Sequence, residues 1–138
     1  MSGDNARMVD FPEPYRDLLD AQFATLATIE PDGTPQLSEI WFIHDDGELR
    51  LSLNTARRKT QNLAERPQCC LMILDVANPF RYVEVRGRAR LEPDDDGSFA
   101  HKLHGKYDAD VAAYDRPGDK RVVVTIEPTR IRPVDMSS

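Results

Sequence analysis

Three consecutive cations, Arg57, Arg58 and Lys59, are the residues whose types and spacing most clearly suggest chemistry. They follow an alternating apolar run, LRLSLN, that predicts a strand over residues 49–54. Asn54 and Thr55 are typical helix-capping residues, so we expect the cations in the first turn of a helix. Cations there oppose the helix dipole by a few tenths to about 1 kcal/mol each unless an anion neutralises them. Because Arg, Lys and helix-terminal N–H groups all bind phosphate, the segment predicts a site for a phosphate-sized anion.

A simpler interpretation is that the three cations are solvated surface side chains paired with Glu65 or with acids elsewhere. A run of three charges in an amphipathic segment is usually of this kind. The order of strand, Asn/Thr cap, basic turn and helix favours the anion site, and both interpretations stay open on the residues alone.

Other chemistry-bearing patterns are weaker. His101 and His104 have a spacing that can bind zinc, but no third ligand is evident nearby, and an exposed helix face explains them better. The acidic stretch DDDG, residues 94–97, lacks the further spaced ligands of a calcium loop. Nucleophile-elbow, zinc-protease, dinucleotide and Walker patterns do not occur. We therefore expect neither a metal site nor a self-contained hydrolase.

Composition restricts the partners. The 138 residues carry a net charge of −6 with 40% hydrophobic and 30% charged residues, which indicates a globular chain. An acidic protein is a poor match for nucleic acid or an anionic membrane, so any anion must bind at a local basic site. We expect a cytoplasmic protein without a membrane span, in which the adjacent Cys69 and Cys70 are reduced residues of a buried strand.

Hydrophobic periodicity predicts the elements that must position the basic turn. Helices are expected over residues 12–22, 56–67 and from Ser98 onward; strands are expected over residues 23–30, 35–44, 49–54, 68–76, 82–92 and 121–134, the last as one strand or a pair. The turns PDGT and DDGE join the first three strands, which predicts an antiparallel meander. Gly87, inside the alternating run YVEVRGRARLE, predicts a bulge or a sharp bend.

About six antiparallel strands with a few helices favour a small closed or split barrel over an open sheet. We expect a mainly β chain in one domain spanning residues 1–138, with residues 1–20 as an N-terminal segment and short helix. In the strand over residues 35–44, Gln36 and Ser38 share a face with core residues. They are either a strand rim that meets water or contacts of a ligand.

With these elements in order, nearly the whole chain resembles the pyridoxamine-phosphate-oxidase-like flavin and deazaflavin split barrels. The resemblance rests on TPQLSEIWF, the RRK turn and RYVEVRG in this order, and it extends to the closing VVVTIEPTRIRPV. It is closest to the branch that uses coenzyme F-420, the 8-hydroxy-5-deazaflavin. The resemblance implies a six-stranded split β-barrel and a homodimer with a cofactor in each interface cleft.

The resemblance also implies roles for particular residues. The basic turn of this family holds the cofactor phosphate, a role that matches Arg57, Arg58 and Lys59, with Asn54 and Thr55 adjoining. The PQLS strand approaches the ring system, which nominates Gln36 and Ser38. The NPFRY segment lies near the interface, which nominates Asn78 and Tyr82, with contacts that reach the partner's cofactor. No side chain is nominated as a catalytic acid or base, because the redox chemistry belongs to the cofactor.

The function implied is transfer of a hydride from reduced F-420 to a small conjugated acceptor. The chain is shorter than the pyridoxamine phosphate oxidases and lacks their Arg-Leu-x-Pro ending, which argues against vitamin B6 oxidation. FMN also carries a phosphate, so an FMN-dependent oxidase or flavin reductase is the alternative enzyme. A non-catalytic flavin or tetrapyrrole carrier is the alternative from another class.

Overall fold

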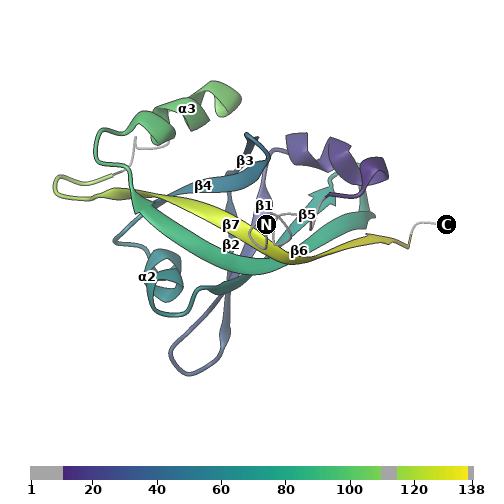
Figure 1. The fold of residues 1–138 in the computed structure, drawn as a ribbon, viewed down its shortest axis with the longest axis horizontal. Coiled ribbons are helices and arrows are strands. Elements are labelled where there is room, and N and C mark those ends of the chain that lie inside the picture. The colour runs from purple at the N-terminus through teal and green to yellow at the C-terminus, as the bar shows by residue number, and fades with distance from the viewer. Residues whose placement is uncertain (1–10, 110–114, 137–138) are drawn as a thin grey trace, which may run out of the picture.

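The computed structural model describes residues 11–109 and 115–136 of the chain. Within this part, one antiparallel sheet is accompanied by three helices, as Figure 1 shows. The strands are β1 (Ala24–Ile29), β2 (Pro35–Ile40), β3 (Ile43–Asp45), β4 (Glu48–Asn54), β5 (Gln68–Asp75), β6 (Asn78–Pro93) and β7 (Arg121–Asp135). The helices are the 3-10 helix η1 (Glu13–Asp20), α2 (Arg58–Glu65) and α3 (Ser98–Tyr107).

The sheet has the strand order β2-β1-β5-β6-β7-β4-β3 and curls into a half-barrel around the long strands β6 and β7 (Figure 1). The prediction of a mainly β, antiparallel split barrel is confirmed. The expected number of six strands is wrong, because the described residues form seven. The segment predicted as one strand over residues 35–44 is divided into β2 and β3, and the closing region is one continuous strand, β7.

The predicted meander of the first three strands is also wrong. β2 pairs with β1, whereas β3 pairs with β4, so β2 and β3 lie at opposite edges of the sheet. The chain crosses between these edges at Trp41 and Phe42. There the Phe42 N–H donates to the Tyr107 hydroxyl at 3.0 Å, and the Phe42 carbonyl accepts from Tyr107 and Lys106 at 2.9 and 2.8 Å. Side chains of α3 therefore satisfy the backbone groups that a continuous ladder would have paired.

The core lies inside the curl of the sheet. Apolar side chains alternate along each strand, and the inward positions are almost fully buried, as the alternation of β6 predicted. These inward residues are Leu26, Leu51, Leu71, Ile73, Val83, Val85, Val124 and Ile126. The helix expected near the N-terminus is present as a 3-10 helix, and it buries Leu18 and Leu19 against this core.

Helix α2 is fixed on β1 by buried polar side chains rather than by apolar packing alone. Asn62, which is 1% exposed, donates to the Thr28 hydroxyl at 3.0 Å and to the Glu30 carboxylate at 2.8 Å. Arg66 donates to the Ile29 carbonyl at 2.7 Å. These bonds set the position of the basic turn, because that turn leads directly into α2.

Helix α3 is capped differently from the expectation. The Asp94 carboxylate accepts from the N–H groups of Phe99 and Ala100 at 3.1 and 3.0 Å, and the Asp96 carboxylate accepts from the Ser98 N–H at 3.0 Å. Ser98 is therefore the first residue of the helix and not its cap. The acidic stretch serves the helix N-terminus, where carboxylates are favourable.

Gly87 lies at a register shift between β6 and β7, which confirms the bulge predicted from the sequence. A Cβ atom at this position would meet the Glu127 carbonyl oxygen at 2.4 Å, a distance far inside van der Waals contact. The close approach of two backbones therefore requires glycine here.

We predict that Gly87→Ala lowers the free energy of unfolding by about 1–3 kcal/mol, because the added methyl group forces β6 and β7 apart. Urea-induced unfolding followed by circular dichroism measures the change. Gly105→Ala is the matched control: Gly105 lies in α3 with no atom within 4 Å of its added Cβ. The control should be neutral or stabilising by a few tenths to about 1 kcal/mol. Equal stability of the two variants would contradict the prediction.

Candidate functional site

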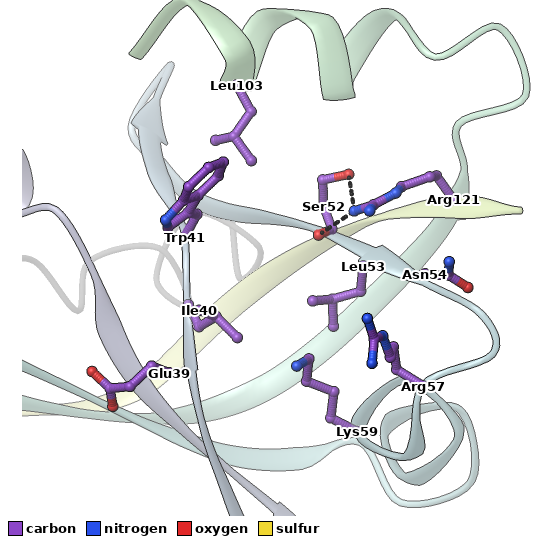
Figure 2. Close-up of a pocket in the computed structure, with 10 residues that line it drawn as sticks. All are labelled: Glu39, Ile40, Trp41, Ser52, Leu53, Asn54, Arg57, Lys59, Leu103 and Arg121. Carbon is purple, nitrogen blue, oxygen red and sulfur yellow. Dashed lines mark hydrogen bonds between the residues drawn. The ribbon is translucent and has the colours of Figure 1, made fainter. Parts of the chain in front are cut away.

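A cleft of about 510 Å³ lies at the open side of the half-barrel, between the end of β2 and strand β4. It is the region where the chain crosses from one sheet edge to the other. Its lining residues come from β2, β4, the basic turn, α3 and β7 (Figure 2). They are Glu39, Ile40, Trp41, Ser52, Leu53, Asn54, Arg57, Lys59, Leu103 and Arg121.

The basic turn begins the helix one residue later than its composition suggested. Arg57 is the N-cap of α2, with no side-chain capping bond, so the expectation that Asn54 and Thr55 start the helix is wrong. Asn54 instead organises the turn before the helix, because its side-chain oxygen accepts from the Ala56 N–H at 2.8 Å and its carbonyl accepts from the Thr60 hydroxyl at 2.7 Å. Thr55 is exposed in this turn, and its N–H donates to the carbonyl of Lys120, the residue before β7, at 2.9 Å.

The three cations do not share one direction. Arg57 and Lys59 line the cleft, and Figure 2 shows both side chains directed toward the space beside Leu53. Arg58 instead pairs with Glu30 at 3.5 Å, and its side chain is 62% exposed. Arg57 is the N-cap residue before α2, and Lys59 is the second residue of the helix. Both line the cleft, whereas Arg58 between them does not.

Lys59 is half-buried in the cleft, whereas Arg57 is exposed at its edge. Neither side chain makes a hydrogen bond or ion pair with a residue in ranges 11–109 or 115–136. Burial, and then the positive charges of Arg57 and Arg121, lower the pKa of the Lys59 ammonium below its usual value of 10.5. The carboxylate of Glu39 points away from both cations (Figure 2). An anion placed between the two cations would relieve this repulsion.

Arg121 is a third cation of the cleft, which the sequence reasoning missed. It lies opposite Asn54 in the β4–β7 pairing, and its guanidinium binds the Asp115 carboxylate with two bonds of 2.9 Å. The hydrogen bonds from Arg121 hold the pKa of Asp115 below its ordinary value. Sixty-two residues separate Arg121 from Lys59 in the chain, so no local pattern signals their meeting; only the pairing of β4 with β7 does.

Asn54 also joins the basic turn to the segment before β7. Its side-chain amide donates to the Asp115 carboxylate at 2.9 Å and to the Asp119 carboxylate at 3.0 Å. With the contacts in the turn, the side chain of this 6% exposed residue is fully used by the protein. Asn54 therefore shapes the wall of the cleft, and the groups available to a ligand at this wall are the side chains of Arg57 and Lys59.

The other end of the cleft is aromatic and apolar. Trp41 stacks on Tyr107 with ring centroids 4.4 Å apart and an interplanar angle of 6°. Tyr107 is held by the backbone of Phe42, and burial raises the pKa of its phenol, so the hydroxyl keeps its proton at neutral pH. The Lys106 ammonium lies 4.0 Å from the centroid of the Phe42 ring and binds the Ala21 carbonyl at 2.9 Å. These contacts fix the aromatic end in one conformation.

Gln36 and Ser38 lie on β2 next to this cleft but outside its lining. Gln36 accepts a bond of 2.7 Å from the Thr28 hydroxyl, so it belongs to the polar contacts between β1 and α2. The Ser38 hydroxyl is buried and has no hydrogen-bond partner among the described residues. Of the two, Ser38 is the one with a free donor and acceptor beside the cleft-lining Ile40.

Asn78 and Tyr82 are not brought to this cleft. They lie at the start of β6, where Asn78 pairs with Asp75 and Tyr82 with Leu74, and the basic turn is at the other end of that strand (Figure 1). Within one chain they are therefore separate from Arg57 and Lys59.

No group of three metal-ligating side chains comes together in the described ranges, 11–109 and 115–136. His101 lies exposed on α3. Cys69 is buried with its pKa raised to about 12 by burial, and both cysteines are free thiols. Among the described residues, no helix has the length and apolar character needed to span a membrane.

A curled antiparallel sheet that stays open on one side, with a cleft at the opening, defines the split β-barrel class of proteins. The family model for pyridoxamine 5'-phosphate oxidase matches residues 11–135, which is nearly the whole chain. The chain therefore belongs to the pyridoxamine-5'-phosphate-oxidase-like family, whose members bind flavins.

Solved structures agree with this assignment. An F-420 reductase is 37% identical, with a TM-score of 0.77, and the match covers 88% of this chain and 98% of that one. A conserved hypothetical protein from Mycobacterium tuberculosis is 27% identical, with a TM-score of 0.72 over 92% of this chain and 86% of that one. A heme-binding protein from Mycobacterium smegmatis, 19% identical, shares the fold with a TM-score of 0.69 over 100% of this chain and 56% of that one.

We predict that Tyr107→Phe lowers the free energy of unfolding by about 1–3 kcal/mol, because the Phe42 N–H loses its acceptor and remains partly buried. Urea unfolding measures the loss. Tyr82→Phe is the control, since the Tyr82 hydroxyl has no hydrogen bond within the described ranges. An unchanged stability of Tyr107→Phe would show that the crossing at Phe42 does not depend on α3.

Proposed function

We propose that the protein is an F-420-dependent reductase that transfers a hydride from the reduced coenzyme to a small conjugated acceptor. The observation that carries the proposal is the pair of cations Arg57 and Lys59, which face one cleft and whose side chains form no hydrogen bond or ion pair within residues 11–109 and 115–136. The 37% identity to an F-420 reductase supports deazaflavin as the ring system.

The cleft fits a phosphate-bearing ligand in two respects. Lys59 has a pKa lowered by burial and by neighbouring cations, a state that a bound phosphate would reverse. Arg57 has a free guanidinium that can bind a phosphate through two parallel bonds. We assign the phosphate to these two residues, with Asn54 and Thr55 shaping the turn. Arg58 is left out because Glu30 already binds it.

The rest of the cleft suits a planar ring. Ile40, Leu53 and Leu103 give it apolar walls. The Ser38 hydroxyl lies on β2 outside this lining, so we assign it no contact with the ring. A bound reduced coenzyme would supply a hydride to the acceptor and release one proton to solvent, and the acceptor would take up one proton from solvent, so that protons and electrons balance. The residues of the chain bind, orient and exclude water, and none is assigned as an acid or base.

The proposal includes a homodimer in the cytoplasm. Family members are commonly dimeric, and a second copy is the means by which Asn78 and Tyr82 would reach a cofactor, since they lie far from the cleft of their own chain. FMN is the alternative cofactor, because its phosphate would meet the same two cations. A carrier without catalysis is the alternative in the class of binding proteins, and a heme-binding protein with this fold illustrates it.

The deciding experiment is titration of the purified protein with F-420 and with FMN, followed by reoxidation of the reduced coenzyme. We expect F-420 to bind more tightly and to be reoxidised by at least one member of a quinone, enone and tetrapyrrole panel. Tight FMN binding without F-420 affinity would overturn the cofactor assignment. Tight binding without reoxidation by any acceptor would favour the carrier.

We predict that Arg57→Ala and Lys59→Ala each weaken coenzyme binding about tenfold or more, because each removes a charge-assisted contact to the phosphate. Arg58→Ala is the matched control from the same turn and should change the Kd less than about threefold, since it removes an exposed ion pair with Glu30. Melting temperatures show that the variants stay folded. Equal losses in all three variants would indicate a diffuse effect of charge rather than a site.

A pH dependence follows from Lys59. Its pKa lies below 10.5 in the free protein, and a bound phosphate favours the charged ammonium, so binding raises that pKa. The affinity for the coenzyme is therefore highest while Lys59 is protonated, and it falls as the pH rises through the lowered pKa of Lys59. We predict that the ratio of wild-type to Lys59→Arg affinity declines as the pH rises through the lowered pKa of Lys59, because arginine keeps its charge. The ratio cancels titration of the ligand itself; a constant ratio would contradict the role of Lys59.

A further inference from the structure

The stacked pair of Trp41 and Tyr107 has no role in holding the phosphate, and it lies at the other end of the cleft. Figure 2 shows Trp41 and Leu103 on one side, Arg57 and Lys59 on the other, and Ile40 and Leu53 between them. One cleft therefore has a cationic end and an aromatic end. The two ends favour different parts of a ligand, or two different ligands.

Trp41 has the properties of a ligand platform. It is 36% exposed, which is unusual for the largest apolar side chain of the protein, and it lines the cleft. Tyr107 covers one indole face in a parallel stack, so the face turned away from Tyr107 is the one available in the cleft. A flat ring that stacks there continues an existing aromatic layer.

The platform is preorganised. The Tyr107 hydroxyl is fixed by two bonds to the Phe42 backbone, and Lys106 is fixed by bonds to the Ala21 and Phe42 carbonyls. Trp41 itself precedes Phe42, so the same contacts fix its backbone. A ligand that stacks on a rigid indole loses little side-chain entropy in the protein.

We propose that Trp41, supported by Tyr107, binds the flat face of the acceptor and selects for planar, electron-poor conjugated rings. This inference rests on the proposed function, since it assigns the cationic end to the coenzyme phosphate and the aromatic end to the second reactant. An acceptor of hydride is electron-poor, and the face of an indole is electron-rich, so the two surfaces attract each other. Saturated, puckered acceptors lack the flat face and gain little from the platform.

The test measures binding of 1,4-naphthoquinone and of its saturated bicyclic diketone to the full chain, without coenzyme and with oxidised coenzyme bound. The chain has a single tryptophan, so its proton NMR spectrum contains one indole N–H resonance, and that resonance reports on Trp41. We expect the ring current of the naphthoquinone to shift this resonance until a plateau is reached in the titration. The saturated diketone should leave the chemical shift unchanged. An indole resonance that does not move with naphthoquinone would overturn the proposal.

Two substitutions separate stacking from bulk. Trp41→Phe keeps a flat ring and should hold the Kd for naphthoquinone, measured by equilibrium dialysis, within about threefold. Trp41→Leu keeps an apolar side chain without a π face and should raise that Kd about fivefold to tenfold. The Kd of the coenzyme should be unchanged in both variants, and melting temperatures verify folding. Equal naphthoquinone affinity of the two variants would overturn the proposal.

The failure of this inference and the failure of the proposed function give different results. Binding of naphthoquinone needs no coenzyme, so the platform can be demonstrated even if F-420 does not bind. If Trp41→Leu instead weakens coenzyme binding and leaves the naphthoquinone Kd unchanged, the coenzyme ring occupies the platform and the assignment to the acceptor is wrong. The role of Arg57 and Lys59 would then still stand.

Discussion

The structure depends on how the chain passes Phe42. At this residue the sheet is interrupted, and its N–H and C=O would cost about 1–3 kcal/mol each if they were left unpaired in a partly buried place. Tyr107 and Lys106 supply the missing partners from α3. Because β2 and β3 can then separate to opposite edges, the sheet stays open, and the opening is the cleft. The helix that satisfies the break also supplies the aromatic wall, so fold and cleft share one set of contacts.

The charged side chains around the cleft are paired selectively. The chain carries a net charge of −6, yet no acid within residues 11–109 and 115–136 forms a hydrogen bond or ion pair with the two cations that face the opening. Asp115 has its pKa lowered mainly by Arg121 and in smaller part by the charge of Arg57. Asp115 binds Arg121, Glu30 binds Arg58, and Asn54 is occupied by Asp115 and Asp119. What remains is Arg57 at the cap of α2 and Lys59 half-buried beside it. Like charges held close together in a partly dry cleft cost free energy of folding, and a ligand anion is the simplest compensation.

The alternation of β6, the bulge at Gly87 and the placement of a basic turn before a helix could all be predicted from the sequence, because each follows from neighbours in the chain. The crossing at Phe42 could not, since its partners lie 64 and 65 residues away and the run over residues 35–44 has an unbroken strand pattern. The place of Arg121 in the cleft could not be predicted either, because it depends on the pairing of β7 with the distant strand β4. Arg58 illustrates a finer limit: three adjacent cations look equivalent in a sequence, but a one-residue shift of the helix cap sends the middle one to Glu30.

A cleft with a cationic end and an aromatic end suits a reaction between two partners of unlike polarity. Phosphate binding would hold a coenzyme by the part that does not react. Its ring would then make no strong polar contact, and apolar walls would set the position of the ring. An aromatic platform binds an acceptor through the flatness that conjugation gives it, and conjugation is also what lets it receive a hydride. Recognition and reactivity would then depend on the same property of the acceptor, so the protein could serve many conjugated molecules without a dedicated polar contact to any of them. Under the proposed function, the chain contributes binding and orientation, and for this reason we assign no side chain as an acid or base.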